Sequence, residues 1–456
     1  MNQYSSAQTG PIEIENICIR CKGSRLLCGK KTCPILMRNS ILKSSVGIDP
    51  KDYKGKKDIF GASPPAVFVG SYGYPKVNIG PLLPIGEYAK SKDTHFLDSP
   101  ESWFGKPIEE IVGFRSSMIR SNFNISVRYN DNLDTTYGKL NRSNRKLLDA
   151  TQELTLASNS VDTEAHLSRI RFNLKYDTNA APTGPSGRAE EIKVVDNIKV
   201  LKSVDKVYSD RDLKAADAIL DYLYKSEDVS ITSIQRLLSA GLLGVKKKRT
   251  LVPTRWSITA VDDIIGKGIA KKLIHFQTLD KTYTFTGKYL DNKFLILLTP
   301  GPWSYEMNEY WHRDSIWNQD IPGVSNNQPS MPVIATDYEF EKGRKNYAGN
   351  ITGAYYAARK EVEEFLFKQR RQARVFVFRE ISGGYLVPLG VWVIRETVRN
   401  ILSDGMKGGN VQIHESLETA LQRIREVFTL PIKHWIKTSH LIPYIRKQRR
   451  LDYWMV

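Results

Sequence analysis

Four cysteines, the only ones in the chain, lie within sixteen consecutive residues and are candidates for binding a metal ion. They are Cys18, Cys21, Cys28 and Cys33 in the run CIRCKGSRLLCGKKTC, which has the spacing C-x2-C-x6-C-x4-C. A gap of two residues lets two thiolates face one tetrahedral ion, so the pattern predicts one structural zinc ion. The same four ligands also suit an iron–sulfur cluster, and buried free thiols or a redox pair are further alternatives.

A second set of candidate residues is acidic. Asp262 and Asp263 end the block RWSITAVDD, while Glu306, Glu309 and His312 belong to GPWSYEMNEYWHRD, where helical spacing would place the two glutamates on one face. A two-metal nuclease needs several carboxylates around ions about 4 Å apart. One hypothesis is therefore Mg²⁺- or Mn²⁺-dependent chemistry at Asp262, Asp263, Glu306 and His312. The alternative is a set of structural ion pairs, which outnumber catalytic ones.

Basic residues are candidates for contacting nucleic acid. The chain has 67 Lys and Arg against 49 Asp and Glu, a formal net charge of +18, which fits a partner that carries phosphates. The proposed contacts are Arg255, Arg359, Lys368, Arg370 and Arg371. DNA is the expected partner, and an RNA-directed factor is a third class that binding at matched salt would distinguish.

Aromatic residues accompany these cations in two places. Tyr355 and Tyr356 precede Arg359 in one expected helix, where they could stack on unpaired bases or simply pack in the core. Tyr72 and Tyr74 lie in the Gly- and Pro-rich segment PPAVFVGSYGYPKVNIGPLLP, together with Lys76. That segment is either a binding loop for phosphate or base, or an irregular connection.

The last nine residues have the spacing of a sliding-clamp binding peptide, the PIP box. Its anchors are Gln448, Leu451, Trp454 and Met455, at positions Q, +3, +6 and +7, and Tyr453 with Trp454 would form the pair in a shifted register. In one 3-10 turn, residues three apart lie on the same side, so Leu451 and Trp454 would form a single apolar plug. The sequence therefore predicts binding to the clamp PCNA. A docked aromatic tail is the alternative.

Folded domains must position these residues, and 456 residues exceed one ordinary core. We expect an α+β fold with mixed, largely antiparallel sheets, in two globular domains plus a zinc module. The expected segments are residues 11–40 for the four-cysteine zinc finger, 64–205 for an N-terminal α+β domain, 206–440 for a C-terminal α+β domain and 446–456 for the clamp-binding tail.

Local patterns predict individual elements. Helices are expected in PIEEIVGFRSSMIR, from Asn144 to Leu156, after the capping residue Ser230, and in ITGAYYAARKEVEEFLFKQRRQ. The segment YTFTGKYLDNKFLILLTPG predicts a hairpin with Asp291 and Asn292 at its turn. A second hairpin is expected from ARVFVFREI and YLVPLGVWVIRE around Gly383 and Gly384.

No window approaches eighteen consecutive apolar residues, and the N-terminus lacks the pattern of a signal peptide. We therefore expect no membrane association and a cytoplasmic protein associated with the nucleoid. Structural disulfides are not expected there.

Several blocks together resemble the archaeal Nre DNA-repair family. They are CIRCKGSRLLCGKKTCPIL, FVGSYGYPKVNIGPLLP, RWSITAVDD, ITGAYYAAR and the terminal clamp peptide, in the same order over almost the whole chain. The resemblance implies repair of damaged DNA, with the finger at Cys18, Cys21, Cys28 and Cys33 and the clamp tail from Gln448 to Met455. It implies no settled catalytic mechanism. Whether the protein is an enzyme therefore depends on the acidic residues alone.

Overall fold

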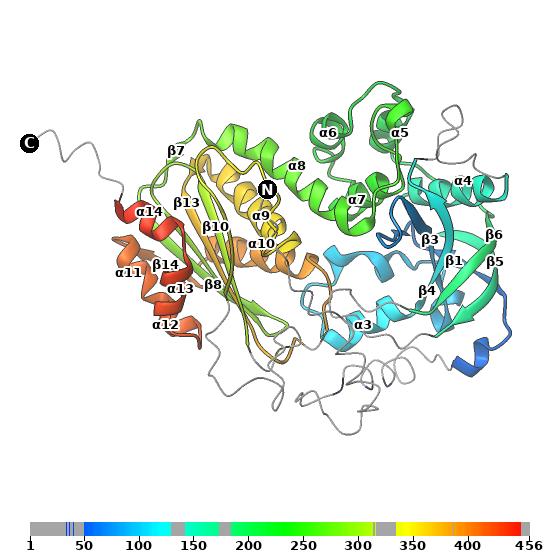
Figure 1. Ribbon diagram of the computed structural model, residues 1–456, viewed down its shortest axis with the longest axis horizontal. Coiled ribbons are helices and arrows are strands. Elements are labelled where there is room, and N and C mark those ends of the chain that lie inside the picture. Colours follow the sequence, from blue (N-terminus) through cyan, green and yellow to red (C-terminus); the bar gives the residue numbers. More distant parts are fainter. Residues whose placement is uncertain are drawn as a thin grey trace, which may run out of the picture.

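The computed structural model describes residues 50–128, 142–172, 184–312, 334–385 and 387–447, together with Cys33, Leu36, Ser40 and Ser315. The expected α+β fold with mixed, largely antiparallel sheets is confirmed. Two lobes, each built on a six-stranded sheet, flank a layer of helices (Figure 1). None of the described helices is both long and apolar enough to cross a membrane.

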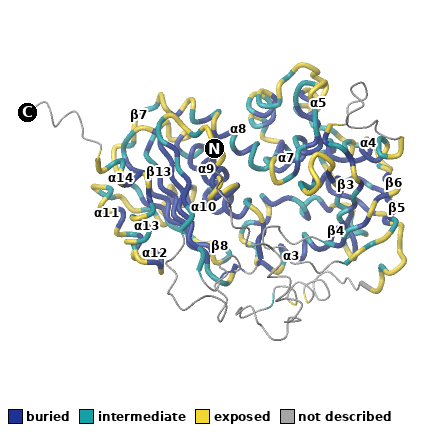
Figure 2. Tube along the Cα trace, in the orientation of Figure 1, coloured by how far each residue is buried: buried dark blue, intermediate teal, exposed yellow. Residues whose placement is uncertain are grey.

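The first sheet has the strand order β1-β5-β6-β4-β3-β2, and only the β4–β6 pair is parallel. Its strands alternate between buried and exposed positions because helix α4 covers one face and solvent reaches much of the other (Figure 2). The strands are β1 (Asp58–Ser63), β2 (Val67–Val69), β3 (Lys76–Pro84), β4 (Met118–Ser126), β5 (Val161–Arg171) and β6 (Ser186–Val194).

The second sheet has the order β11-β10-β13-β9-β8-β14, again with one parallel pair, β10–β13. A separate two-stranded parallel sheet joins β7 (Gln277–Thr278) to β12 (Arg371–Gln372). The main strands are β8 (Thr282–Tyr289), β9 (Asn292–Thr299), β10 (Ser304–Trp311), β11 (Ile334–Glu339), β13 (Arg374–Ile381) and β14 (Val411–His414).

Helices cover both faces of the second sheet. Helices α9 and α10 lie on the face turned toward the first lobe, and α11 to α14 lie on the outer face (Figure 1). The α-helices of the described residues are α3 (Ile108–Ser116), α4 (Arg142–Leu156), α5 (Lys202–Ser209), α6 (Ala215–Asp217), which continues as a π-helix (Ala218–Leu223), α7 (Ile231–Ser239), α8 (Thr254–Leu273), α9 (Gly353–Gln369), α10 (Trp392–Met406), α11 (Leu417–Leu421), α12 (Arg423–Val427), α13 (Ile432–Thr438) and α14 (Leu441–Lys447).

Successive residues of the second sheet therefore enter two different cores. On β13, Val375 and Val377 belong to an inner apolar cluster, whereas Phe376 and Phe378 belong to an outer one beneath α11 to α14. The inner cluster is continuous from Ile59 in the first sheet to the far end of α10. The two lobes are thus packed against each other through a shared core.

Two expectations about local structure are wrong. The first hairpin turns at Leu290 and Asp291, both with positive φ, and Asn292 already pairs with Tyr289 in the strands. The second hairpin does not form, because most of VWVIRE belongs to α10, which begins at Trp392. Its β-branched residues have strand-like composition, but the apolar spacing continues along α10 as a helical face against β8.

Candidate functional site

Two of the sequence blocks named above meet where α8 begins. The segment FVGSYGYP ends β2 and forms the turn to β3, and the first half of α8 contains RWSITAVDD. The backbone N–H of Val69 donates to Thr254 Oγ1 at 2.9 Å, and the rings of Tyr74 and Trp256 lie 5.2 Å apart. The start of α8 is therefore held by a residue of the first sheet and flanked by an aromatic turn.

The third block, ITGAYYAAR, begins α9 and lies beside α8. A Cβ at Gly353 would approach Val391 Cγ1 to 2.9 Å and Thr259 Oγ1 to 3.5 Å, so only glycine allows this close approach. Further along, a Cβ at Gly266 would meet Glu363 Oε2 at 2.4 Å. Later residues of α8 therefore contact later residues of α9, so the two helices run side by side in the same direction.

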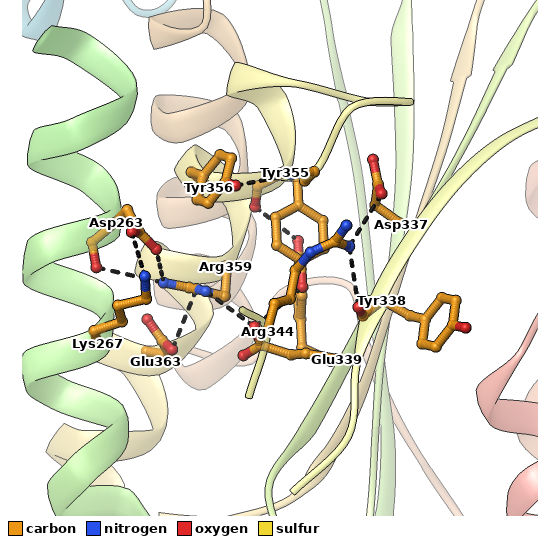
Figure 3. A network of polar contacts seen from close by, with 12 residues as sticks. Asp263, Lys267, Asp337, Tyr338, Glu339, Arg344, Tyr355, Tyr356, Arg359 and Glu363 are labelled. Atoms are coloured by element: carbon orange, nitrogen blue, oxygen red, sulfur yellow. Dashed lines mark hydrogen bonds and ion pairs between the residues drawn. The ribbon is translucent and has the colours of Figure 1, made fainter. Parts of the chain in front are cut away.

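Arg359 forms the centre of a buried network between these helices and β11 (Figure 3). Its guanidinium lies 2.9 Å from Asp263 Oδ1, 3.0 Å from Glu339 Oε2 and 3.5 Å from Glu363 Oε1. Burial alone would lower the pKa of Arg359, but these carboxylates outweigh it and raise that pKa. Only 2% of Arg359 is exposed, so it does not reach a phosphate at the surface.

Glu363 is the most deeply buried carboxyl group of this network. It is fully buried, and burial raises its pKa to about 8, although Arg359 acts to lower it. Neither of its side-chain oxygens has a hydrogen-bond partner among the described residues.

Asp262 and Asp263 point in different directions, as adjacent helix residues must, about 100° apart. Asp262 is buried and accepts from Arg395 of α10 at 2.6 Å, whereas Asp263 pairs with Arg359 and with Lys267, 2.7 Å away. They therefore serve two separate ion pairs that tie α8 to α10 and to α9.

Glu306 and Glu309 lie on strand β10, not on a helix, so the expectation of a shared face is wrong. Glu306 faces the outer helices, where it accepts from the Ser439 hydroxyl and from the His440 backbone N–H at 2.5 Å. Glu309 faces the opposite side and binds Arg379 at 2.6 Å. Burial raises the pKa of Glu306 to about 7 despite these hydrogen bonds.

His312 follows β10 and contacts Glu380 of β13, with Nε2 3.2 Å from Oε1. Burial acts to raise the pKa of Glu380, but hydrogen bonds from His312, Thr429 and Leu430 outweigh it and lower that pKa to about 2. The second sheet separates this pair from Asp262 and Asp263 on α8 (Figure 1).

The structure does not bring the four candidate catalytic residues together. Within the described ranges, no group of three or more His, Cys, Asp or Glu side chains could hold a metal ion. Each candidate carboxylate already has a cation or hydrogen-bond donor as partner. The arrangement of these residues accordingly favours structural ion pairs over nuclease chemistry.

The basic residues predicted to contact nucleic acid divide into buried and exposed ones. Arg255, Lys368 and Arg370 are exposed, and Arg371 is half-buried with Nε 4.0 Å from Asp280. Two cations that we did not predict lie beside them. Lys271 and Lys272 end α8, and the Lys272 ammonium lies 5.6 Å from the Phe367 ring of α9. We call this surface the basic end: Lys271, Lys272, Lys368, Arg370 and Arg371.

Exposed aromatic rings lie at the other end of α8. Tyr72 is 94% exposed, Tyr74 54% and Trp256 44%, and the exposed cations Lys76 and Arg255 neighbour them in sequence. Adjacent exposed rings, such as Tyr74 and Trp256 with centroids 5.2 Å apart, can mark a binding surface. We call these five residues the aromatic surface. By contrast, Tyr355 and Tyr356 are buried in the core.

Several predicted residues lie outside the described part of the chain. These are Cys18, Cys21 and Cys28 of the zinc motif and Gln448, Leu451, Tyr453, Trp454 and Met455 of the tail. Cys33 is described, half-buried and not in a disulfide. The zinc site and the clamp peptide therefore stay predictions.

Comparison with known proteins covers nearly the whole chain. Residues 27–318 match the family model described as archaeal Nre, N-terminal, and residues 339–454 match archaeal Nre, C-terminal. No solved structure matches significantly.

Three curated relatives carry repair names. DNA repair protein NreB of Archaeoglobus fulgidus is 38% identical over 426 residues, 93% of this chain and 96% of the relative. DNA repair protein NreA of the same organism is 38% identical over 404 residues, covering 89% and 92%. DNA repair protein NreA of Haloferax volcanii is 32% identical over 354 residues, covering 76% and 79%. The chain belongs to the archaeal Nre family.

Proposed function

We propose that this protein acts in DNA repair, binds DNA along the α8 side of the molecule and is recruited by the sliding clamp PCNA through its last nine residues. The observation that carries the repair role is the similarity, over nine tenths of the chain, to relatives named DNA repair proteins. The formal charge of +18 supports a partner that carries phosphates.

The surface of α8 supports the placement of DNA. Trp256, Lys267 and Lys271 are exposed and are separated by eleven and four residues, which places them on one stripe of the helix. The stripe begins at the aromatic surface and ends at the basic end. Lys271 lies fifteen residues after Trp256, a rise of about 22 Å along the helix, so the stripe would follow about seven nucleotides of a duplex strand.

The two ends of this stripe differ in chemistry. Cations at the basic end would neutralise backbone phosphates without regard to sequence. Rings at the aromatic surface would stack on unpaired bases, because every base has a flat π-face. The proposed substrate is therefore DNA with duplex and single-stranded parts side by side.

Fluorescence anisotropy with labelled duplex and single-stranded DNA tests this placement. We expect the double variant Lys271→Glu, Lys272→Glu to weaken binding to both DNAs at least tenfold and to flatten the salt dependence. Trp256→Ala should weaken single-stranded binding more than duplex binding, because stacking contributes about 1–3 kcal/mol per base. Lys433→Glu, an exposed site on the outer helix α13, is the matched control. Equal affinities for all variants would refute the α8 surface.

The end of the described chain supports recruitment by a clamp. Helix α14 is anchored by Leu441 and Ile442 in the outer core, and it ends with exposed Arg446 and Lys447. The described chain thus ends at Lys447 on the outer side of the second sheet, on the opposite side of that sheet from α8, which supports a clamp contact away from the proposed DNA surface. A clamp bound there would leave the proposed DNA surface open.

Removal of residues 448–456 should abolish binding of PCNA in calorimetry while the melting temperature stays unchanged. The paired substitution Leu451→Ala, Trp454→Ala should have the same effect, since it removes the apolar plug. Lys433→Glu, an exposed site on α13 outside residues 446–456, is the control and should bind. Undiminished binding by the truncated protein would exclude the tail as the clamp peptide.

We also propose that Cys18, Cys21, Cys28 and Cys33 hold one zinc ion. Four thiolates form a closed tetrahedral site, which would order a segment too short to fold alone. Native mass spectrometry should find one zinc per chain, and an iron chromophore would contradict the assignment.

A further inference from the structure

A pocket lies at the edge of the first sheet, far along the molecule from the α8 stripe. It is formed by the 3-10 helix Pro50–Tyr53, the turn that follows it and the end of β5, and its volume is about 310 Å³. The residues that decide its chemistry are Tyr53, Lys54, Lys56, Lys57, Arg169 and Phe172. These residues belong to none of the motifs described above.

The pocket is strongly basic. Lys54, Lys56, Lys57 and Arg169 are all exposed, and among the described residues none of the four is paired with a carboxylate. No acidic residue lines the pocket, and Asp58, which follows Lys57, is bound to His166 Nδ1 at 2.6 Å. Four like charges around one hollow repel one another, and a bound anion would remove that repulsion.

Two aromatic rings form the apolar part of the pocket. Tyr53 and Phe172 have their centroids 5.8 Å apart at an interplanar angle of 52°, and both are half-buried. The Tyr53 hydroxyl accepts from the Gly86 backbone N–H at 2.9 Å, which fixes this ring in place. A flat group could stack here while its charged part reaches the lysines.

The turn that carries the lysines is held in position by its backbone. The N–H of Lys54 donates to the carbonyl of Lys51, Lys56 donates to Tyr53, and Leu167 of β5 donates to the carbonyl of Lys57 at 2.8 Å. Gly55 has φ +82°, which L side chains rarely adopt. The cations are therefore presented by an ordered turn tied to the sheet.

From this juxtaposition we propose that the pocket binds one phosphorylated nucleotide, its phosphate among Lys54, Lys56, Lys57 and Arg169 and its base against Tyr53 and Phe172. The volume is at the small end of ligand pockets, as expected for a single nucleotide and not a duplex. The nucleotide is either free or the phosphorylated terminal residue of a DNA strand. This site is separate from the α8 surface and does not depend on it.

Calorimetric titration of the full-length protein with deoxyadenosine 5′-monophosphate, deoxyadenosine and inorganic phosphate tests the proposal. The monophosphate should bind at least tenfold more tightly than either of the other two, since only it uses both parts of the pocket. Lys54→Glu with Lys56→Glu should reduce its affinity at least tenfold, and Phe172→Ala should reduce it to that of phosphate. Lys433→Glu should bind as the unmodified protein does.

Two outcomes would overturn the proposal: equal affinity for phosphate and monophosphate, or unchanged monophosphate affinity in a correctly folded Lys54→Glu, Lys56→Glu variant. Oligonucleotides with and without a 5′-phosphate distinguish the two sources. Preference for the phosphorylated end identifies a strand terminus, and preference for the monophosphate identifies a free nucleotide. Circular single-stranded DNA has no ends, so loss of its binding only in the Lys271→Glu, Lys272→Glu variant would report on the α8 surface and not on the pocket.

Discussion

The two six-stranded sheets each contain one parallel strand pair, but their surroundings are very different. In the first sheet, strands β5 and β6 alternate between buried and exposed residues, so charged side chains reach water. In the second, strands β9, β10 and β13 are buried on both faces (Figure 2). Charged residues such as Glu306, Arg379 and Glu380 are nevertheless part of these strands, and each has a polar partner.

The difference shows what a charged residue means in each setting. On the first sheet, a charge at an exposed strand position needs no partner. On the second, an unpaired charge would lose its hydration, so each must be matched within the protein. Residues that resemble a metal-binding group in the sequence, such as Glu306 and His312, are therefore engaged in holding the second lobe together.

The largest expected effect is that of Arg359→Met. Removal of Arg359 leaves the buried Glu339 without its cation, while Asp263 keeps Lys267, and should cost about 3–5 kcal/mol of unfolding free energy. Arg188→Met, on the exposed side of β6, should change it by less than about 0.5 kcal/mol. Urea denaturation measures both values. Similar losses for the two variants would remove the distinction between the sheets.

A smaller effect that depends on pH is expected for Glu306→Gln. The folded pKa of about 7 lies above the unfolded value of 4.5, so the native protein holds this proton more tightly. Its contribution to stability is complete below pH 4.5 and is lost as pH rises to 7, by about 3 kcal/mol. The glutamine variant should lack this loss and gain stability relative to the unmodified protein above pH 7.

Denaturation from pH 4 to pH 8 checks this prediction, with Glu164→Gln on the exposed side of β5 as control. The control should follow the pH dependence of the unmodified protein. An identical pH dependence in Glu306→Gln would mean that Glu306 is charged in the folded state at neutral pH.

The smallest effect is expected for Phe60→Thr on β1. This ring is 57% exposed, so its replacement should change the unfolding free energy by less than about 1 kcal/mol. The same substitution at Phe378, fully buried 5.6 Å from the Trp435 ring, should cost several-fold more. Thermal denaturation of the pair compares an open sheet face with a covered one directly.

Much of the fold could be predicted because local signals agree with it. Ser230 caps α7 as expected, accepting from the Ser233 N–H at 3.0 Å, and periodicity identifies α4 and α9. The sequence predicted a hairpin strand where α10 begins, because VWVIRE is rich in strand-forming residues. Only the apolar spacing over the longer segment indicates a helix. The α+β class can be predicted because such local helix and strand patterns extend over whole elements.

The site was less accessible to prediction. Arg359 is buried because it contacts Asp263 and Glu339, which are 96 and 20 residues away along the chain. Lys271 and Lys272 are evident in the sequence as basic residues. Only the pairing of β7 with β12 and the contact of Lys272 with Phe367 show that they share a surface with Arg370. Such long-range contacts leave no trace in local spacing.

The hydrogen bonds from Ser439 and His440 to Glu306 have a mechanical consequence. They join the linker before α14 to strand β10, which is paired on both edges, with β11 and with β13. Tension applied to the chain beyond Lys447 would pass through α14 into that doubly paired strand, where force acts on many backbone hydrogen bonds at once. A pull on the carboxyl end would therefore load α14 first and reach the sheet through the hydrogen bonds from Ser439 and His440.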